Sequence, residues 1–229
     1  MAQDWTTKDN KLRSGIWMRW AIKHLDVMSD LGGYGILGGD KKYQNVADHL
    51  LVVNAASVLL AKKIKTTGQA INMNLVDKGS ILHDIAKRFQ RESGIFYDKE
   101  YSSNTTREIL EKLGYPESVI NVAEYTGRVP EIHISDDEKQ QQAVQEKPLE
   151  HLIVAYVDAR VRNTDIVLLE EARDRNKVKV PKDAKFYDQW YRFYKKVEER
   201  LFKLINNQFK PTDLNNSTVY TMIQEEVMK

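Results

Sequence analysis

The sequence predicts an all-α protein folded as a single domain over residues 1–229. Apolar side chains recur at helical spacing along most of the chain, and few segments show the alternating period of a strand. At 229 residues the chain can bury one substantial core, and nothing in it requires a second domain. We expect a helical bundle with its core over about residues 15–205 and C-terminal helices over about residues 185–229 packed on it.

The longest apolar segment predicts the central helix over residues 43–65, because apolar side chains cover nearly every side of it. Gly114 and Pro116 end one helix and start the next. Pro148 fits the first turn of a helix that carries Asp158. In chain order, helices are expected over residues 11–28, 43–65, 71–92, 105–113, 116–125, 149–162 and 186–205, and after Asn215.

Three segments interrupt this succession of helices. Five of the eleven glycines fall within residues 31–40, which excludes a stable helix interior and favours a flexible connection. Residues 128–147 are polar and lack an apolar period, so we expect a long loop. Pro181 breaks the pattern within residues 177–185.

The aromatic segment FYDQWYRFY that follows is expected to serve core packing or a contact within a homo-oligomer.

Composition excludes several classes of function. Charged residues make up 30% of the chain but the formal net charge is only +2, so nucleic acid is not an expected partner. Cysteine is absent, which rules out disulfides, thiolate metal sites and cysteine nucleophiles. The polar first residues resemble neither a signal nor a transit peptide, and no apolar run approaches the roughly 18 residues that cross a bilayer. We expect a cytoplasmic location and no membrane partner.

Four metal-capable side chains stand on three apolar segments of the sequence: His49, His83, Asp84 and Asp158. The helical spacing places His49 and Asp158 on the packed sides of their helices. Since a buried polar group needs a partner, and a buried carboxylate needs a strong one, a shared metal ion would satisfy all four. Imidazole nitrogen and carboxylate oxygen suit borderline and hard divalent cations.

The His83-Asp84 pair alone is weak evidence for such a site. Composition predicts about 0.4 His-Asp pairs by chance. In isolation, His83 could donate to a backbone carbonyl and Asp84 could be a surface charge. The addition of His49 and Asp158, each at the centre of an apolar helix, favours the metal site.

The ordered motifs resemble the HD-domain superfamily of metal-dependent phosphohydrolases. The resemblance rests on His49 within NVADHLLVVNAASVLLA, on ILHDIAKR with His83-Asp84, and on LIVAYVDARV with Asp158, and it covers roughly residues 15–205. Around the first motif, together with Arg19-Trp20, the sequence is most similar to the 5′-deoxynucleotidase branch. Around the pair it is closer to the general HDIGK version.

The resemblance implies a role for each residue. His49, His83, Asp84 and Asp158 would coordinate one divalent ion, with Mn, Co, Ni, Fe, Zn and Mg not distinguished. Lys87 would stabilise charge on the phosphoryl group, and Asp84 would orient the attacking water. The substrate would be a small phosphorylated molecule, in first place a nucleotide. Arg88, Arg160 and Arg162 are weaker candidates than Lys87 for stabilising this charge, with a solvated position on an exposed face as the alternative for each. Glu124 could orient the water in place of Asp84, with a surface position on a helix as its alternative. Further candidates for substrate contacts are Arg19, Arg88, Glu124 and Arg162.

Two departures from the superfamily pattern shape these expectations. Ser102 and Tyr125 stand where two-metal branches carry further histidines, which favours one metal. His133 is a possible extra ligand, with an exposed loop position as its alternative. Lys87 replaces an acidic residue that is usual in the 5′-deoxynucleotidase branch. The alternatives to a phosphohydrolase are a non-catalytic HD module that binds a nucleotide or protein partner, and an HD-type di-iron oxygenase.

Overall fold

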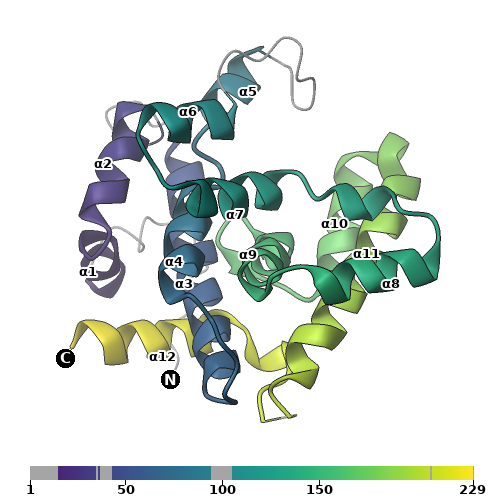
Figure 1. Ribbon diagram of the computed structural model, residues 1–229. Helices are drawn as coiled ribbons and strands as arrows, with labels where there is room; N and C mark the ends of the chain where they lie inside the picture. Colours follow the sequence, from purple (N-terminus) through teal and green to yellow (C-terminus); the bar gives the residue numbers. More distant parts are fainter. Residues whose placement is uncertain (1–14, 35, 37–42, 94–104, 207, 229) are drawn as a thin grey trace.

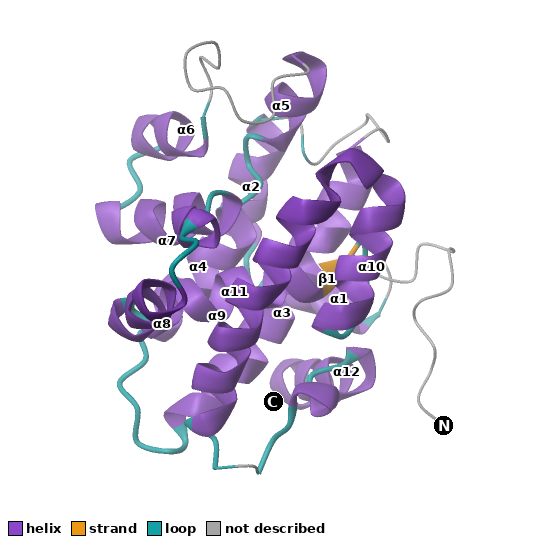
Figure 2. Ribbon diagram, turned by 90° about the vertical axis from the view of Figure 1, so that its right-hand side faces the viewer, coloured by secondary structure: helices purple, strands orange, loops and turns teal. Residues whose placement is uncertain are grey.

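The computed structural model describes residues 15–34, 36, 43–93, 105–206 and 208–228, and its regular structure is almost entirely helical (Figures 1 and 2). The prediction of an all-α fold is confirmed. In the described residues the α-helices are α1 (Ile16–Ile22), α2 (Leu25–Gly33), α3 (Gln44–Lys65), α4 (Met73–Leu82), α5 (Lys87–Ser93), α6 (Thr106–Lys112), α7 (Glu117–Gly127), α8 (Asp137–Glu146), α9 (Leu149–Arg160), α10 (Leu169–Lys179), α11 (Ala184–Lys203) and α12 (Asn216–Val227). Short 3-10 helices lie at Pro130–His133, Pro181–Asp183 and Pro211–Asp213.

Helix α3 is the centre of the core, as its all-round apolar sequence predicts. It packs against α4 and α9, while α7 packs against both of those helices. Figure 1 shows α9 almost end-on, between the α3 and α4 pair and the α10 and α11 pair. Val53, Ala56 and Leu60, which share a helical stripe with His49, are fully buried. No described helix is long and apolar enough to cross a lipid bilayer.

The helix expected over residues 71–92 is interrupted at the His-Asp pair, so that prediction was wrong. Asn72 caps α4 by accepting hydrogen bonds from the backbone N–H groups of Asn74 (3.2 Å) and Leu75 (3.3 Å). Helix α4 then ends at Leu82, residues 83–86 form turns, and α5 begins at Lys87. His83 and Asp84 therefore occupy a turn instead of successive positions on one helix.

The expected first helix is also two helices. A break after Ile22 separates α1 from α2, and His24 at this break is buried and lies 3.4 Å from the Asp77 carboxylate. Helix α2 continues through Gly33. It therefore includes the first residues of the segment 31–40, where the glycine content predicted no stable helix. Residues 11–14 and most of residues 34–42 lie outside the described residues.

The prediction of a long loop over residues 128–147 was also wrong, because this segment contains a 3-10 helix and α8. Asp136 caps α8 by accepting from the Lys139 backbone N–H at 3.0 Å. The helix buries Gln140 and Val144 and packs against α11. Only these two side chains of α8 are buried among its described residues, and one of them is polar, so the sequence shows no apolar period.

The helix that carries Asp158 ends at Arg160, two residues earlier than expected, and leads into a short β-hairpin. Strands β1 (Val161–Arg162) and β2 (Asp165–Ile166) pair antiparallel, with Val161 opposite Ile166. Asn163 in the connecting turn has φ 58°, a left-handed conformation that asparagine tolerates better than most residues. Helix α12 runs along the bottom of the molecule in the view of Figure 1 and contacts α1 and α3.

Candidate metal centre

Three elements bring His49, His83 and Asp158 together: α3, the turn after α4, and α9. One ligand-type atom from each residue lies within 4.8 Å of the others. The Asp158 Oδ1 atom lies 3.0 Å from His49 Nε2 and 3.3 Å from His83 Nε2. Two ligands bound to one ion at about 2.1 Å lie roughly 3.0–3.4 Å apart for bond angles of about 90–109°. Both separations from the Asp158 oxygen therefore fit ligands of one ion.

His83 presents a buried nitrogen that lacks a hydrogen-bond partner. The ring is 2% exposed, and its Nδ1–H donates to the Ser80 carbonyl at 2.7 Å. This bond directs Nε2 toward Asp158, but Nε2 makes no hydrogen bond of good geometry in the described structure. A buried nitrogen that makes no hydrogen bond costs free energy unless another group binds it. A metal ion at this position would bind it, so the residues present fit the ion that the motifs imply.

His49 has the same arrangement at the other side of the cluster. Its Nδ1 lies 3.2 Å from the Asn163 carbonyl oxygen, and its Nε2 faces Asp158. When Nδ1–H donates to this carbonyl, Nε2 keeps its lone pair for a ligand role. A hydrogen bond from the second nitrogen is the usual way in which proteins orient a metal-binding imidazole. Asn163 and Ser80 were not among the residues that the sequence singled out, because they contribute only backbone carbonyls.

The charges of the cluster shift its protonation equilibria. Burial alone would lower the pKa of His83, but the Asp158 and Asp84 carboxylates outweigh burial and raise this pKa to about 9. Burial would raise the pKa of Asp158, but His83 and His49 hold it well below its usual range. The cluster without an ion therefore balances an ionised Asp158 with a protonated His83.

Asp84 and Lys87 adjoin the cluster. The Asp84 Oδ2 atom lies 4.0 Å from His83 Nε2, and its Oδ1 accepts a hydrogen bond from Lys87 Nζ at 3.2 Å. Burial would raise the pKa of Asp84, but Lys87 and then His83 lower it. Asp84 is thus an ionised carboxylate beside a cation.

Arg162 is mostly buried near Asp158, on β1. Its guanidinium lies 5.6 Å from the centre of the Trp190 ring, and Nη1 donates to the Val161 carbonyl at 3.0 Å. Its Nε is buried and has no hydrogen-bond partner. Burial lowers the pKa of Arg162, while the Asp158 carboxylate opposes this effect. The guanidinium of Arg162 therefore lies within electrostatic reach of the Asp158 carboxylate.

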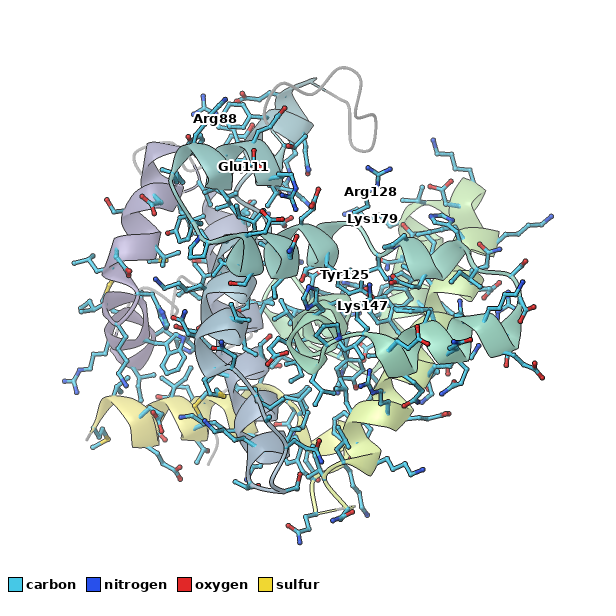
Figure 3. All side chains as sticks on the ribbon, in the orientation of Figure 1. Arg88, Glu111, Tyr125, Arg128, Lys147 and Lys179 are labelled. Carbon is cyan, nitrogen blue, oxygen red and sulfur yellow. The ribbon has the colours of Figure 1, made fainter. Side chains whose placement is uncertain are left out.

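The structure places the other candidates outside the cluster. Arg19 is exposed on α1, and Arg88 pairs with Glu92 along α5 at 3.1 Å, in the upper part of Figure 3. Glu124 pairs with Arg107 at 2.9 Å, and exposed His133 lies against the Phe186 ring. Arg160 is fully buried and bonds four groups of its surroundings, so its role is structural.

Tyr125 and Ser102 stand in the sequence about where two-metal branches carry further histidines. Tyr125 lies against Lys147, whose Nζ is 4.5 Å from the ring centre; the two side chains are labelled together in Figure 3. The same lysine pairs with Glu131 at 2.6 Å. Ser102 lies outside the described residues. Within the described part of the chain, the metal-type cluster consists of His49, His83 and Asp158.

Fold and site together define an all-helical protein with a candidate metal centre of two imidazoles and a carboxylate. The model of the HD domain matches residues 46–163, which is 118 of the 229 residues and includes all three cluster residues. The chain belongs to the HD-domain family. Comparison with curated proteins and with solved structures gave no match. The match extends to the family and does not reach the 5′-deoxynucleotidase branch.

Proposed function

We propose that the protein is a metal-dependent phosphohydrolase that cleaves a phosphate ester of a nucleotide or a related small molecule. HD domains are commonly metal-dependent hydrolases, and this chain belongs to that family. The observation that carries the proposal is the convergence of His49, His83 and Asp158, with His83 Nε2 buried and without a hydrogen-bond partner.

One divalent ion would be held by His49 Nε2, His83 Nε2 and an oxygen of Asp158, with Asp84 as the fourth proposed ligand. When bound, such an ion lowers the pKa of a water molecule and polarises a phosphoryl oxygen. The Ser80 and Asn163 carbonyls orient the two imidazoles by accepting from their Nδ1–H groups. The low pKa of Asp158 keeps this carboxylate ionised for binding the ion.

Asp84 and Lys87 are the proposed residues beside the reacting phosphate. Since the pKa of Asp84 is lowered, its carboxylate is a weak base, and we assign it the role of orienting the water by accepting a hydrogen bond. Lys87 is held within 3.2 Å of Asp84 and would stabilise negative charge on the non-bridging phosphoryl oxygens. Hydrolysis forms a bond from the water oxygen to phosphorus and breaks the bond from phosphorus to the ester oxygen, which leaves with a proton.

The test is an assay of the purified, metal-depleted protein against a panel of nucleotides and small phosphate esters, with Mn²⁺, Co²⁺, Ni²⁺ or Mg²⁺ added singly. We expect turnover that depends on the ion and is lost, by at least about 100-fold, in Asp158→Asn. Asp137→Asn is the matched control, because Asp137 is 82% exposed on α8. Absence of turnover with every ion and substrate would contradict the proposal. Retained ligand binding by His83→Ala without hydrolysis by the wild type would favour a non-catalytic binding module.

A further inference from the structure

The turn of the β-hairpin contacts His49 on the side of the ring opposite the metal-facing nitrogen. The Asn163 carbonyl, at 3.2 Å from His49 Nδ1, comes from a left-handed residue between two strands of only two residues each. An isolated two-stranded hairpin is marginally stable in water. Its position over His49 therefore depends on contacts with other elements.

Asn216, the first residue of α12, supplies such a contact. Its Oδ1 accepts from the Ile166 backbone N–H at 2.8 Å, and its Nδ2 donates to the Thr164 carbonyl at 3.0 Å. One side-chain amide thus binds a donor and an acceptor on either side of Asp165. The Thr164 peptide group directly follows Asn163, so the clamp acts next to the carbonyl that meets His49.

Helix α12 is also fixed to the helix that carries His49. It packs against α3, and Glu226 near its C-terminal end pairs with Lys62 of α3 at 2.8 Å. Helix α12 thus contacts α3 at one end and the hairpin at the other, and the hairpin turn in turn contacts His49 of α3. A displacement of Asn216 would leave α3 in place and move the turn relative to His49.

We propose that Asn216 is a positioning residue of the metal centre. Through the hairpin turn, it holds the Asn163 carbonyl against His49 Nδ1, which keeps the Nε2 lone pair directed at the ion. Outer partners of metal-binding histidines typically change metal affinity by about 10–100-fold, and a residue one step further out is expected at the lower end, about tenfold. The inference rests on the proposed function only in requiring that the site binds a divalent ion.

The first measurement is the affinity for Mn²⁺, by competition with a chelating dye, for Asn216→Ala and for Asn215→Ala. Asn215 caps the same helix by accepting from the Thr218 backbone N–H at 3.1 Å, while its side-chain Nδ2 donates to the Thr212 carbonyl and, in the described part of the chain, not to the hairpin. Its variant therefore controls for a weakened α12. We expect about a tenfold loss for Asn216→Ala and a change below twofold for Asn215→Ala. Equal affinities in the two variants would overturn the inference.

Two variants of the turn separate positioning from general damage. Asn163→Gly keeps the carbonyl and tolerates a positive φ, so its Mn²⁺ affinity should stay within threefold of the wild type. Asn163→Val disfavours the left-handed conformation and should lose affinity as Asn216→Ala does. Loss in the glycine variant equal to that in the valine variant would contradict a role for the carbonyl.

The second readout does not require metal. In the metal-free protein, the His49 Nδ1–H proton should exchange with water faster in Asn216→Ala than in Asn215→Ala, as measured by nitrogen-edited NMR. If the wild type binds no ion, the proposed function fails while this measurement still tests the clamp. If the wild type binds Mn²⁺ and the exchange rates of the two variants agree, only the clamp is refuted.

Discussion

Binding of a divalent ion should displace one proton from His83, and this gives the metal affinity a defined pH dependence. The Asp158 and Asp84 carboxylates overcome the effect of burial and raise the pKa of His83 to about 9, so the ring is protonated at neutral pH. Its Nδ1–H is bound to the Ser80 carbonyl, and Nε2 must therefore carry the proton that leaves. An ion can bind Nε2 only after that proton is lost.

The size of the effect follows from the raised pKa. At pH 7, two units below a pKa of about 9, only about one ring in a hundred is neutral, which costs about 2.7 kcal/mol of binding free energy. The apparent affinity should rise about tenfold per pH unit between pH 6.5 and 8.5 and level off above about pH 9. The sign is fixed because the protonated ring is the form that cannot bind.

Isothermal titration with Mn²⁺ in two buffers of different ionisation enthalpy measures the number of protons released. At pH 7 we expect about one proton per ion from the wild type. The variant His24→Asn should release the same number, because His24 pairs with Asp77 outside the cluster. Release of no proton at pH 7, or an affinity that does not change between pH 6.5 and 8.5, would refute the assignment of His83 Nε2 as a ligand.

Two further predictions concern the packing that holds the site. A Cβ atom on Gly79 would lie 2.4 Å from Val122 Cγ1, so Gly79→Ala should destabilise the contact of α4 with α7 by about 1–3 kcal/mol in urea unfolding. Gly33→Ala, where the added atom meets nothing within 4 Å, is the control, and equal stability of the two variants would contradict the close contact. Arg160→Met should lower the free energy of unfolding by about 3 kcal/mol, because it leaves the Val167, Pro211 and Leu214 carbonyls without their buried donor. Exposed Arg192→Met should change stability by less than about 0.5 kcal/mol, and a similar loss in both variants would refute the role of the buried network.

The fold class and the central helix could be predicted because their signals are local and strong. The apolar residues of α3 give its bounds to within one residue, 44–65 against the predicted 43–65. Helix α8 could not be predicted in this way. It buries Gln140 through hydrogen bonds to the Glu131 and Ile134 carbonyls, and no apolar period marks such a face.

The residues of the candidate site could be predicted from their types, but the groups that orient them could not. His49, His83 and Asp158 are chemically distinctive and stand in a recognisable order. The groups that orient them are backbone carbonyls, and any residue can supply a carbonyl. Their identity depends on where each helix ends, which tertiary packing decides.

Helices α4 and α9 both end earlier than the sequence predicts, and the two carbonyls lie at these ends: Ser80 within the last turn of α4, and Asn163 in the hairpin that follows α9. The last four carbonyls of a helix lack partners within it, and Ser80 is among the last four residues of α4. The break after Leu82 therefore turns His83 back toward an acceptor that a continuous helix would have used for its own hydrogen bonds. Likewise, the end of α9 at Arg160 allows the chain to fold back as a hairpin and to place Asn163 over His49. The helical pattern thus stops earlier than predicted on both sides of the candidate metal centre, and backbone carbonyls at these two breaks orient the imidazoles.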